Sequence, residues 1–116
     1  MKIELPWPPT VNSYWRCISG RNILSKKGRA YREAGLKHLM ASRTAPQKTL
    51  HGRISASIQV FPPDRRRRDL DNILKPVLDL LVHAGIIIDD ENIDRILVER
   101  GETTSGGEVV VVLEEI

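Results

Sequence analysis

Several large classes of protein need features that this sequence lacks. Its single cysteine, Cys17, cannot form a disulfide within the chain or assemble a thiolate zinc site. Aromatic residues make up only 4% of the chain, and no apolar run approaches the roughly 20 residues that cross a bilayer. The first six residues lack the apolar stretch and cleavage site of a secretory signal. We therefore expect a cytoplasmic protein with no membrane association.

The composition that remains is typical of one folded unit. The 116 residues are 41% hydrophobic and 28% charged, which favours a single globular domain spanning residues 1–116. A chain of this length buries roughly two thirds of its unfolded surface. It can therefore form a hydrophobic core without disulfides or a structural metal.

Basic and acidic residues are unevenly distributed along the chain. Residues 14–53 contain ten Lys and Arg against a single acid, Glu33, whereas residues 89–116 contain nine acids and two bases. A basic block favours a polyanion such as nucleic acid, because Lys and Arg contacts to phosphates release counterions. A solvated surface is the alternative, since a run of charge does not by itself define a binding site.

Hydrophobic spacing and turn residues predict the order of the elements. Ser25 is a predicted N-cap for a helix to about residue 43, and residues 54–61 alternate as a strand with one buried face. The most clearly amphipathic helix spans about 72–84, with Gly85 as its stop and Pro76 as the reason for an irregular first turn. The remaining predictions are a strand over 2–5, a loop from the Pro6–Pro9 run to about residue 24, and strands over 93–99 and 108–114 that form a hairpin.

This order predicts an α+β domain in which a small mixed β-sheet has two helices packed on one face. Tyr14 and Trp15 are candidates for stacking on nucleic-acid bases, with packing as the alternative for Trp15. An exposed edge of the predicted hairpin would offer a surface for pairing with a second subunit.

The segment from Asp64 to Asn72, between the predicted strand and the core helix, contains the clearest chemistry. Four consecutive arginines, Arg65–Arg68, precede two acids, Asp69 and Asp71. On an extended backbone these two carboxylates point to the same side and repel each other, whereas on a helical turn they diverge. If they lie together they need nearby cations or a bound metal, and Mg²⁺ accepts carboxylate and phosphate oxygens as ligands.

A third carboxylate lies within reach of this segment. A helix of about 13 residues is roughly 20 Å long, and an extended run from Gly85 to Asp90 returns about 16 Å, so Asp90 can reach the helix start. Lys75 follows Asp71 by four residues, and on a regular helix its ammonium shares that face and can stabilise charge on a phosphate. A solvated acidic turn is the alternative for Asp90.

Helix capping is the alternative for Asp69 and Asp71, because carboxylates are favourable at the positive end of the helix dipole. The arginines favour the metal interpretation. They suit a site that draws phosphates towards carboxylates that would otherwise repel them.

Three blocks of the sequence resemble the RusA-type Holliday-junction resolvases, which are small, homodimeric, Mg²⁺-dependent endodeoxyribonucleases of prophages and bacteria. The blocks are Leu5–Asn12 (LPWPPTVN), Pro63–Asn72 (PDRRRRDLDN) and the Ala84-Gly85 pair that leads to Asp89-Asp90. The central block is specific, and the resemblance covers nearly the whole chain.

The resemblance implies which residues act. Asp69, Asp71 and Asp90 would be the catalytic, metal-binding carboxylates, and Lys75 the catalytic basic residue that assists at the phosphate. The cofactor would be Mg²⁺, which Mn²⁺ can replace, with no small-molecule cofactor. The reaction would be metal-assisted hydrolysis of a phosphodiester bond. The DNA-binding residues we expect are Thr10, Asn12, Ser13, Arg16, Lys26, Lys27, Arg65, Arg66, Arg67, Arg68 and Asn72.

A homodimer is expected because two symmetric nicks in branched DNA, a Holliday junction, need two identical sites. The alternative function is a non-catalytic dimeric protein that binds branched DNA, in which Asp69 and Asp71 are caps and the arginines only bind phosphate. Cleavage of a four-way junction in the presence of Mg²⁺ separates the two.

Overall fold

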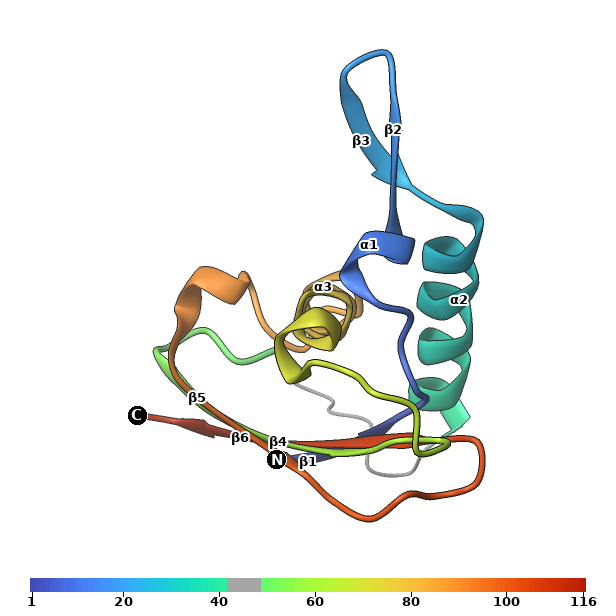
Figure 1. Ribbon diagram of the computed structural model, residues 1–116. Helices are drawn as coiled ribbons and strands as arrows, with labels where there is room; N and C mark the ends of the chain where they lie inside the picture. Colours follow the sequence, from blue (N-terminus) through green and yellow to red (C-terminus); the bar gives the residue numbers. More distant parts are fainter. Residues whose placement is uncertain (42–48) are drawn as a thin grey trace.

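A four-stranded mixed β-sheet with two helices on one face forms the body of the protein (Figure 1). The computed structural model describes residues 1–41 and 49–116. The strands lie in the order β1 (Lys2–Leu5), β6 (Glu108–Glu115), β4 (Ile54–Phe61) and β5 (Ile93–Arg100). β4 pairs antiparallel with β6 and parallel with β5, and β1 pairs antiparallel with β6. The fold class predicted from the sequence is confirmed.

The predicted hairpin of residues 93–99 and 108–114 is wrong. Both strands exist, but β4 lies between them, so β5 and β6 do not pair. The connection crosses the end of β4 instead, where Gly101 N donates to Val60 O at 2.8 Å. Gly106-Gly107 does form a turn with positive φ, and this turn leads the chain onto the other side of β4.

Helices α2 (Lys26–Ala41) and α3 (Leu74–His83) cover the same face of the sheet (Figure 1). Alternation along β4 turns Ile54, Ala56, Ile58 and Val60 towards them, and each is at most 1% exposed. The described part of the chain contains no helix long and apolar enough to cross a membrane. The largest fully buried side chains are Tyr14, Ile3, Leu5, Ile54, Ile58, Ile73, Leu80, Leu81, Ile87, Leu113, Val60 and Val77.

Ser25 caps α2 as predicted. Its hydroxyl oxygen accepts a hydrogen bond from Gly28 N at 3.0 Å, which satisfies one of the donors that the first turn of a helix leaves without a partner. The predicted end of this helix, near residue 43, lies outside the described residues.

The loop predicted from the proline run to about residue 24 is wrong over its second half. That part contains the short helix α1 (Val11–Tyr14) and an antiparallel hairpin of β2 (Trp15–Ile18) and β3 (Arg21–Leu24). The hairpin projects from the body of the protein (Figure 1). Ser19 and Gly20 join its strands and both have positive φ, as a two-residue hairpin turn requires. The Ser-Gly pair is the sequence signal for this hairpin, and the prediction of a loop overlooked it.

The helix predicted over about 72–84 is confirmed, together with its irregular start. A 3-10 helix, η1 (Leu70–Ile73), leads into α3. Pro76 stands in the first turn of α3, where the backbone N–H that it lacks would have no helical partner. Gly85, with φ of +75°, follows the end of the helix.

Gly28 sets the separation of α1 and α2. A Cβ there would overlap the carbonyl oxygen of Tyr14, which accepts a hydrogen bond from Ser25 N at 2.9 Å. We expect Gly28→Ala to lower the free energy of unfolding, measured with urea, by ~1–3 kcal/mol because the contact becomes overpacked. The control is Gly52→Ala, whose Cβ would meet only Glu115 at 3.9 Å. Stabilisation by about 1 kcal/mol, the usual gain at an exposed helical glycine, would contradict this packing.

Candidate metal and nucleic-acid site

An ion pair between α3 and the turn before β5 lies at the centre of the candidate site. Lys75, the second residue of α3, donates from Nζ to Oδ2 of Asp90 at 2.9 Å. Asp90 begins the 3-10 helix η2 (Asp90–Asn92), which leads directly into β5. The hydrogen bond from the Lys75 ammonium holds the pKa of Asp90 below its usual range, although partial burial acts in the opposite direction.

Residues 86–89 bring the chain back from the end of α3. Ile86 N donates to Leu81 O at 3.0 Å, and Ile87 forms a parallel bridge with Leu50, a few residues before β4. Ile86 and Ile87 are 2% and 1% exposed, so burial of two large apolar side chains fixes this path. The expected return of Asp90 to the helix start is observed, whereas its role as a metal ligand stays a prediction.

Asp69 and Asp71 lie at the start of the same helical segment, and both are exposed. Asp69 occupies the N-cap position of η1 with extended backbone angles, but its side chain makes no capping hydrogen bond. Asp71 lies in the first turn of η1, where its backbone oxygen accepts a hydrogen bond from Leu74 N. The capping interpretation is therefore wrong for Asp69.

The three carboxylates do not form a ready-made metal cluster. Within residues 1–41 and 49–116, no three Asp, Glu, His or Cys side chains converge as metal ligands would. The structure brings Lys75 and Asp90 into contact. Asp69 and Asp71 are exposed and lie a few residues before Lys75 in the sequence. The three side chains offer hard carboxylate oxygens, the ligand type that Mg²⁺ prefers, and a metal on Asp90 would share that carboxylate with the Lys75 ammonium.

A cavity of about 280 Å³ includes one of these carboxylates. Its lining consists of Thr10, Arg67, Arg68, Asp69, Asn72 and Ile73. The cavity thus joins the N-terminal block of the sequence to the central one. Guanidinium, hydroxyl and amide groups beside a carboxylate provide the contacts that hold a phosphate next to a divalent cation.

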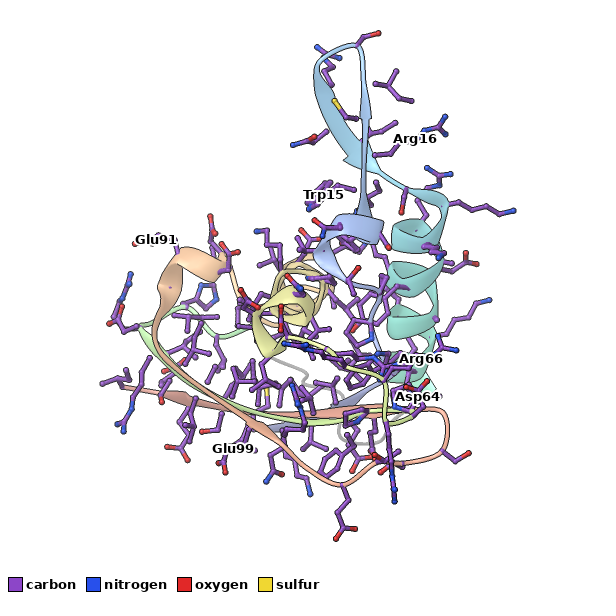
Figure 2. The ribbon with its side chains drawn as sticks, in the orientation of Figure 1. Trp15, Arg16, Asp64, Arg66, Glu91 and Glu99 are labelled. Atoms are coloured by element: carbon purple, nitrogen blue, oxygen red, sulfur yellow. The ribbon has the colours of Figure 1, made fainter. Side chains whose placement is uncertain are left out.

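Arg68 differs from the three exposed arginines before it, because its side chain is only 18% exposed. Its guanidinium pairs with Asp64 at 2.7 Å and lies 5.6 Å from the centre of the Trp7 ring. Asp64 also accepts a hydrogen bond from Arg66 N at 2.9 Å, and Figure 2 shows Asp64 and Arg66 together near the end of β4. Arg68 therefore shapes the loop that presents the exposed residues Arg65–Arg67.

Other predicted DNA contacts lie on a different part of the surface. Arg16 is on β2 and Lys26-Lys27 are in the first turn of α2, and all three side chains are exposed. Figure 2 shows Arg16 well apart from Arg66. Asn12-Ser13 belong to α1, whose N-cap, Thr10, reaches the cavity. The structure therefore groups Thr10, Arg67, Arg68 and Asn72 at the cavity, leaves Arg65 and Arg66 in the loop after β4, and places the others on α1, β2 and the start of α2.

The prediction that Tyr14 stacks on bases is wrong, because this side chain is fully buried. Its hydroxyl donates to Asp79 of α3, and Arg32 of α2 donates to the same carboxylate at 2.6 Å. Burial and the hydrogen bond to Asp79 raise the pKa of Tyr14 to about 12. Trp15 is half-buried and packs edge-on against Tyr14, with ring centres 5.1 Å apart. Tyr14 thus joins α1 to both long helices.

Asp69, at the start of η1, lines a cavity together with Arg67 and Arg68, and this combination suits a phosphate ester with a divalent cation. Residues 6–114 match the family model described as Endodeoxyribonuclease RusA. The chain belongs to the RusA family of endodeoxyribonucleases, and the resemblance seen in its sequence is confirmed.

Relatives named crossover junction endodeoxyribonuclease RusA match nearly the full chain. The protein of Enterobacteria phage HK97 is 39% identical over 112 residues, which cover 97% of this chain and 92% of the relative. The protein of Enterobacteria phage 82 is 36% identical over 114 residues, and that of Escherichia coli K12 is 35% identical over 114 residues. Each of these two alignments covers 98% of this chain and 93% of the relative. The similarity is therefore not confined to one motif.

The ion pair with Arg68 and the hydrogen bond from Arg66 N lower the pKa of Asp64 to about 2. Because the folded-state pKa is the lower one, this stabilisation is present above the ordinary pKa of about 4 and is lost as the pH falls towards the folded value. We expect carboxyl-carbon NMR to show protonation of Asp64 beginning at higher pH in Arg68→Met, which keeps the aliphatic stem but loses the charge. Arg67→Met is the matched control. Identical Asp64 curves in the wild type and Arg68→Met would disprove the assignment.

Proposed function

We propose that this protein resolves Holliday (four-way) junctions by paired symmetric hydrolysis of phosphodiester bonds in DNA recombination and repair, with Mg²⁺ as its cofactor. The proposal rests on the similarity of 97–98% of the chain to proteins named crossover junction endodeoxyribonuclease. In this proposal residues 1–116 are one RusA-like endonuclease domain that acts on DNA in the cytoplasm.

Asp69, Asp71 and Asp90 are the proposed metal ligands, and Mn²⁺ is expected to substitute for Mg²⁺. When held there, such an ion would supply an activated water molecule and polarise a phosphoryl oxygen. Lys75 holds Asp90 at the first turn of α3, close in sequence to the other two acids. Asp69 uses no oxygen for capping, so its carboxylate can contribute to the ligand set.

Lys75 is the proposed stabiliser of the negative charge that develops on the phosphate. Its ammonium has three donors, of which the bond to Asp90 Oδ2 occupies one. Its side chain is 47% exposed, which allows the ammonium to contact a phosphate beside Asp90. A cation held beside Asp90 would stabilise the transition state through its charge.

The proposed DNA path begins at the cavity and continues towards the hairpin. Thr10, Arg67 and Asn72 line the cavity and would bind the phosphate nearest the carboxylates. Arg68 contributes mainly by fixing the loop through Asp64. The remaining proposed contacts, which attract the backbone by charge or bond to it, are Asn12, Ser13, Arg16, Lys26, Lys27, Arg65 and Arg66.

The alternative is a non-catalytic dimeric protein that binds branched DNA, and it requires Asp69 and Asp71 to act as helix caps. Asp69 makes no such cap. The family is named for endodeoxyribonuclease activity. These two observations favour the enzyme.

Asp71→Asn tests the proposed ligands. The side chain is exposed, so we expect stability to change by no more than about 0.5 kcal/mol. Junction binding without divalent ions should persist or tighten because one charge that repels phosphate is lost. Cleavage of a labelled four-way junction in Mg²⁺ should fall by a factor on the order of 100 or more. The control is Glu114→Gln, an exposed acid near the end of β6. Cutting at the wild-type rate by Asp71→Asn would remove Asp71 from the site.

A homodimer is proposed because a four-way junction is nearly two-fold symmetric and needs two nicks. Within the described chain, the outer edge of the eight-residue strand β5 pairs with no other strand. Ile96 and Leu97 at its centre are 44% and 52% exposed. An exposed edge of this length favours pairing with another strand, and a second copy of β5 is the proposed partner.

The side chains of β5 are self-complementary in one antiparallel register. With the two-fold axis at Leu97, Arg95 stands opposite Glu99 of the partner subunit. In the same register the apolar Ile96 stands opposite Val98 of the partner subunit. A shift by one residue places Arg95 opposite Arg100, or Asp94 opposite Glu99, and is disfavoured by repulsion. Figure 2 shows Glu99 on the sheet face away from the helices.

This register places both candidate sites on the same side of the dimer. Residues that belong to the same sheet face stand opposite each other, so the two sheets form one continuous sheet with all helices on one face. Two sites on a single face suit a single junction that receives two symmetric cuts.

Arg95→Glu tests the interface, because it places two carboxylates opposite each other at two symmetric positions in the dimer. We expect the dissociation constant of the dimer, measured by light scattering on a sizing column, to rise at least about tenfold. The double variant Arg95→Glu with Glu99→Arg restores opposite charges and should recover the dimer. Lys2→Glu, on the other edge of the sheet, is the control. A double variant as monomeric as the single one would exclude this register.

A further inference from the structure

Arg53, the residue before β4, binds the segment that contains Asp90. Its guanidinium donates from Nε to the Asp94 carboxylate at 2.9 Å, and Nη2 donates to the same group. Nη2 also donates to the backbone oxygen of Glu91 at 2.8 Å, while Nη1 lies 3.4 Å from the Glu91 carboxylate. One side chain therefore joins η2 and the start of β5 to the chain that enters β4.

We propose that Arg53 is a positioning residue for Asp90 in the cleavage reaction proposed above, on which this inference depends. Arg53 does not belong to the site predicted from the sequence, where it counted only towards the basic block of residues 14–53.

η2 needs such an anchor because it contains no buried residue. Figure 2 shows Glu91 on this exposed turn. One hydrogen bond of η2 is local, from Glu91 N to the Asp89 carboxylate at 3.1 Å, and does not connect η2 to the sheet. Asn92 Nδ2 donates to His51 O at 3.2 Å, which is a second bond to the segment of Arg53. Within η2 itself, hydrogen bonds to residues 51–53 hold the turn beside β4, and the bond from Lys75 to Asp90 holds it beside α3.

The bond between Lys75 and Asp90 does not by itself set the direction of the Asp90 carboxylate. A lysine ammonium is a point charge on a flexible stem, whereas the planar guanidinium of Arg53 binds in a fixed fork geometry. Arg53 holds Glu91 and Asp94, which follow Asp90 in η2 and at the start of β5. The backbone from which Asp90 projects is fixed in this way.

Arg53 also neutralises two acids next to the site. Glu91 and Asp94 are one and four residues from Asp90, and both are paired with Arg53. Without that pairing their carboxylates would offer competing oxygen ligands to a divalent cation. Loss of Arg53 is therefore expected to weaken productive metal binding even if the turn moves little.

These contacts contribute little to overall stability. The side chains of Arg53 and Asp94 are 47% and 44% exposed, and ion pairs of that exposure have small effects on folding. A positioning role consequently predicts that the effect of Arg53→Ala appears in the turn and at the metal, and not in the melting temperature.

The experiment compares Arg53→Ala and Arg53→Lys with the full-length wild-type protein. The control is Lys37→Ala, which removes a similar exposed ion pair, with Glu33 at 3.5 Å, on the far part of α2. Four quantities are measured: hydrogen exchange of residues 89–94, Mn²⁺ affinity by calorimetry, the Mg²⁺ concentration for half-maximal junction cleavage, and junction affinity without divalent ions.

For Arg53→Ala we expect faster exchange confined to residues 89–94. We also expect Mn²⁺ affinity to fall about tenfold and the Mg²⁺ requirement to rise about tenfold. Junction affinity without metal should stay within about twofold, because Arg53 is bound to acids and lies outside the proposed DNA path. Arg53→Lys keeps the charge without the fork and should restore part of the metal affinity, while Lys37→Ala should behave as the wild type.

Unchanged exchange and unchanged Mn²⁺ affinity in Arg53→Ala would overturn the proposal. Faster exchange across the whole protein, or a large loss of junction affinity, would also overturn it by showing a general structural or DNA-binding role. Failure of the proposed function is a separate result, in which the wild type itself cuts no junction in Mg²⁺. Exchange and Mn²⁺ affinity would still test the hold of Arg53 on η2 in that case.

Discussion

Parallel pairing of β5 with β4 is the constraint on which the candidate site depends. Two parallel neighbours start at the same end of a sheet, so the chain that leaves β4 must cross over through a helix and return before β5 begins. α3 is that crossover, and the buried residues Ile86 and Ile87 make the return. Asp90 lies where the return ends, and there it meets Lys75 in the first turn of α3. The contact between the two charges is therefore a consequence of sheet topology.

The short helix α1 relates this site to the projecting hairpin. Thr10, at its N-cap, lines the cavity that contains Asp69. Tyr14, at its other end, is buried and bonded to Asp79 of α3, and Arg32 of α2 bonds to the same carboxylate. Because the hairpin begins at the next residue, both the cavity and the hairpin are attached to the helices through one four-residue element. A nucleic acid that contacts the two would meet surfaces held at a fixed separation.

The sequence predicted the elements that bury one face, because alternation along β4 and the apolar spacing of α3 are local patterns. It also predicted the return of Asp90, which follows from element lengths. It did not predict that β4 separates β5 from β6, because the Gly106-Gly107 turn occurs equally in a hairpin and in a crossing connection. The roles of Tyr14 and Arg53 depend on which elements contact each other in the folded protein. The composition of the sequence and the spacing of its residues do not predict those contacts. Asp69 occupies the N-cap position of η1. Only the absence of a capping hydrogen bond to its side chain distinguishes a metal ligand from a helix cap.

The central proposal is that Asp69, Asp71 and Asp90 together bind Mg²⁺ next to Lys75. Paramagnetic broadening by Mn²⁺ in NMR spectra of the isotopically labelled protein tests it most directly. We expect the signals of these three aspartates and of Lys75 to broaden together, at the lowest Mn²⁺ concentrations, and to recover when Mg²⁺ is added in excess. Broadening that begins elsewhere, for example at Glu114 and Glu115, and reaches Asp90 separately from Asp69 and Asp71 would contradict it.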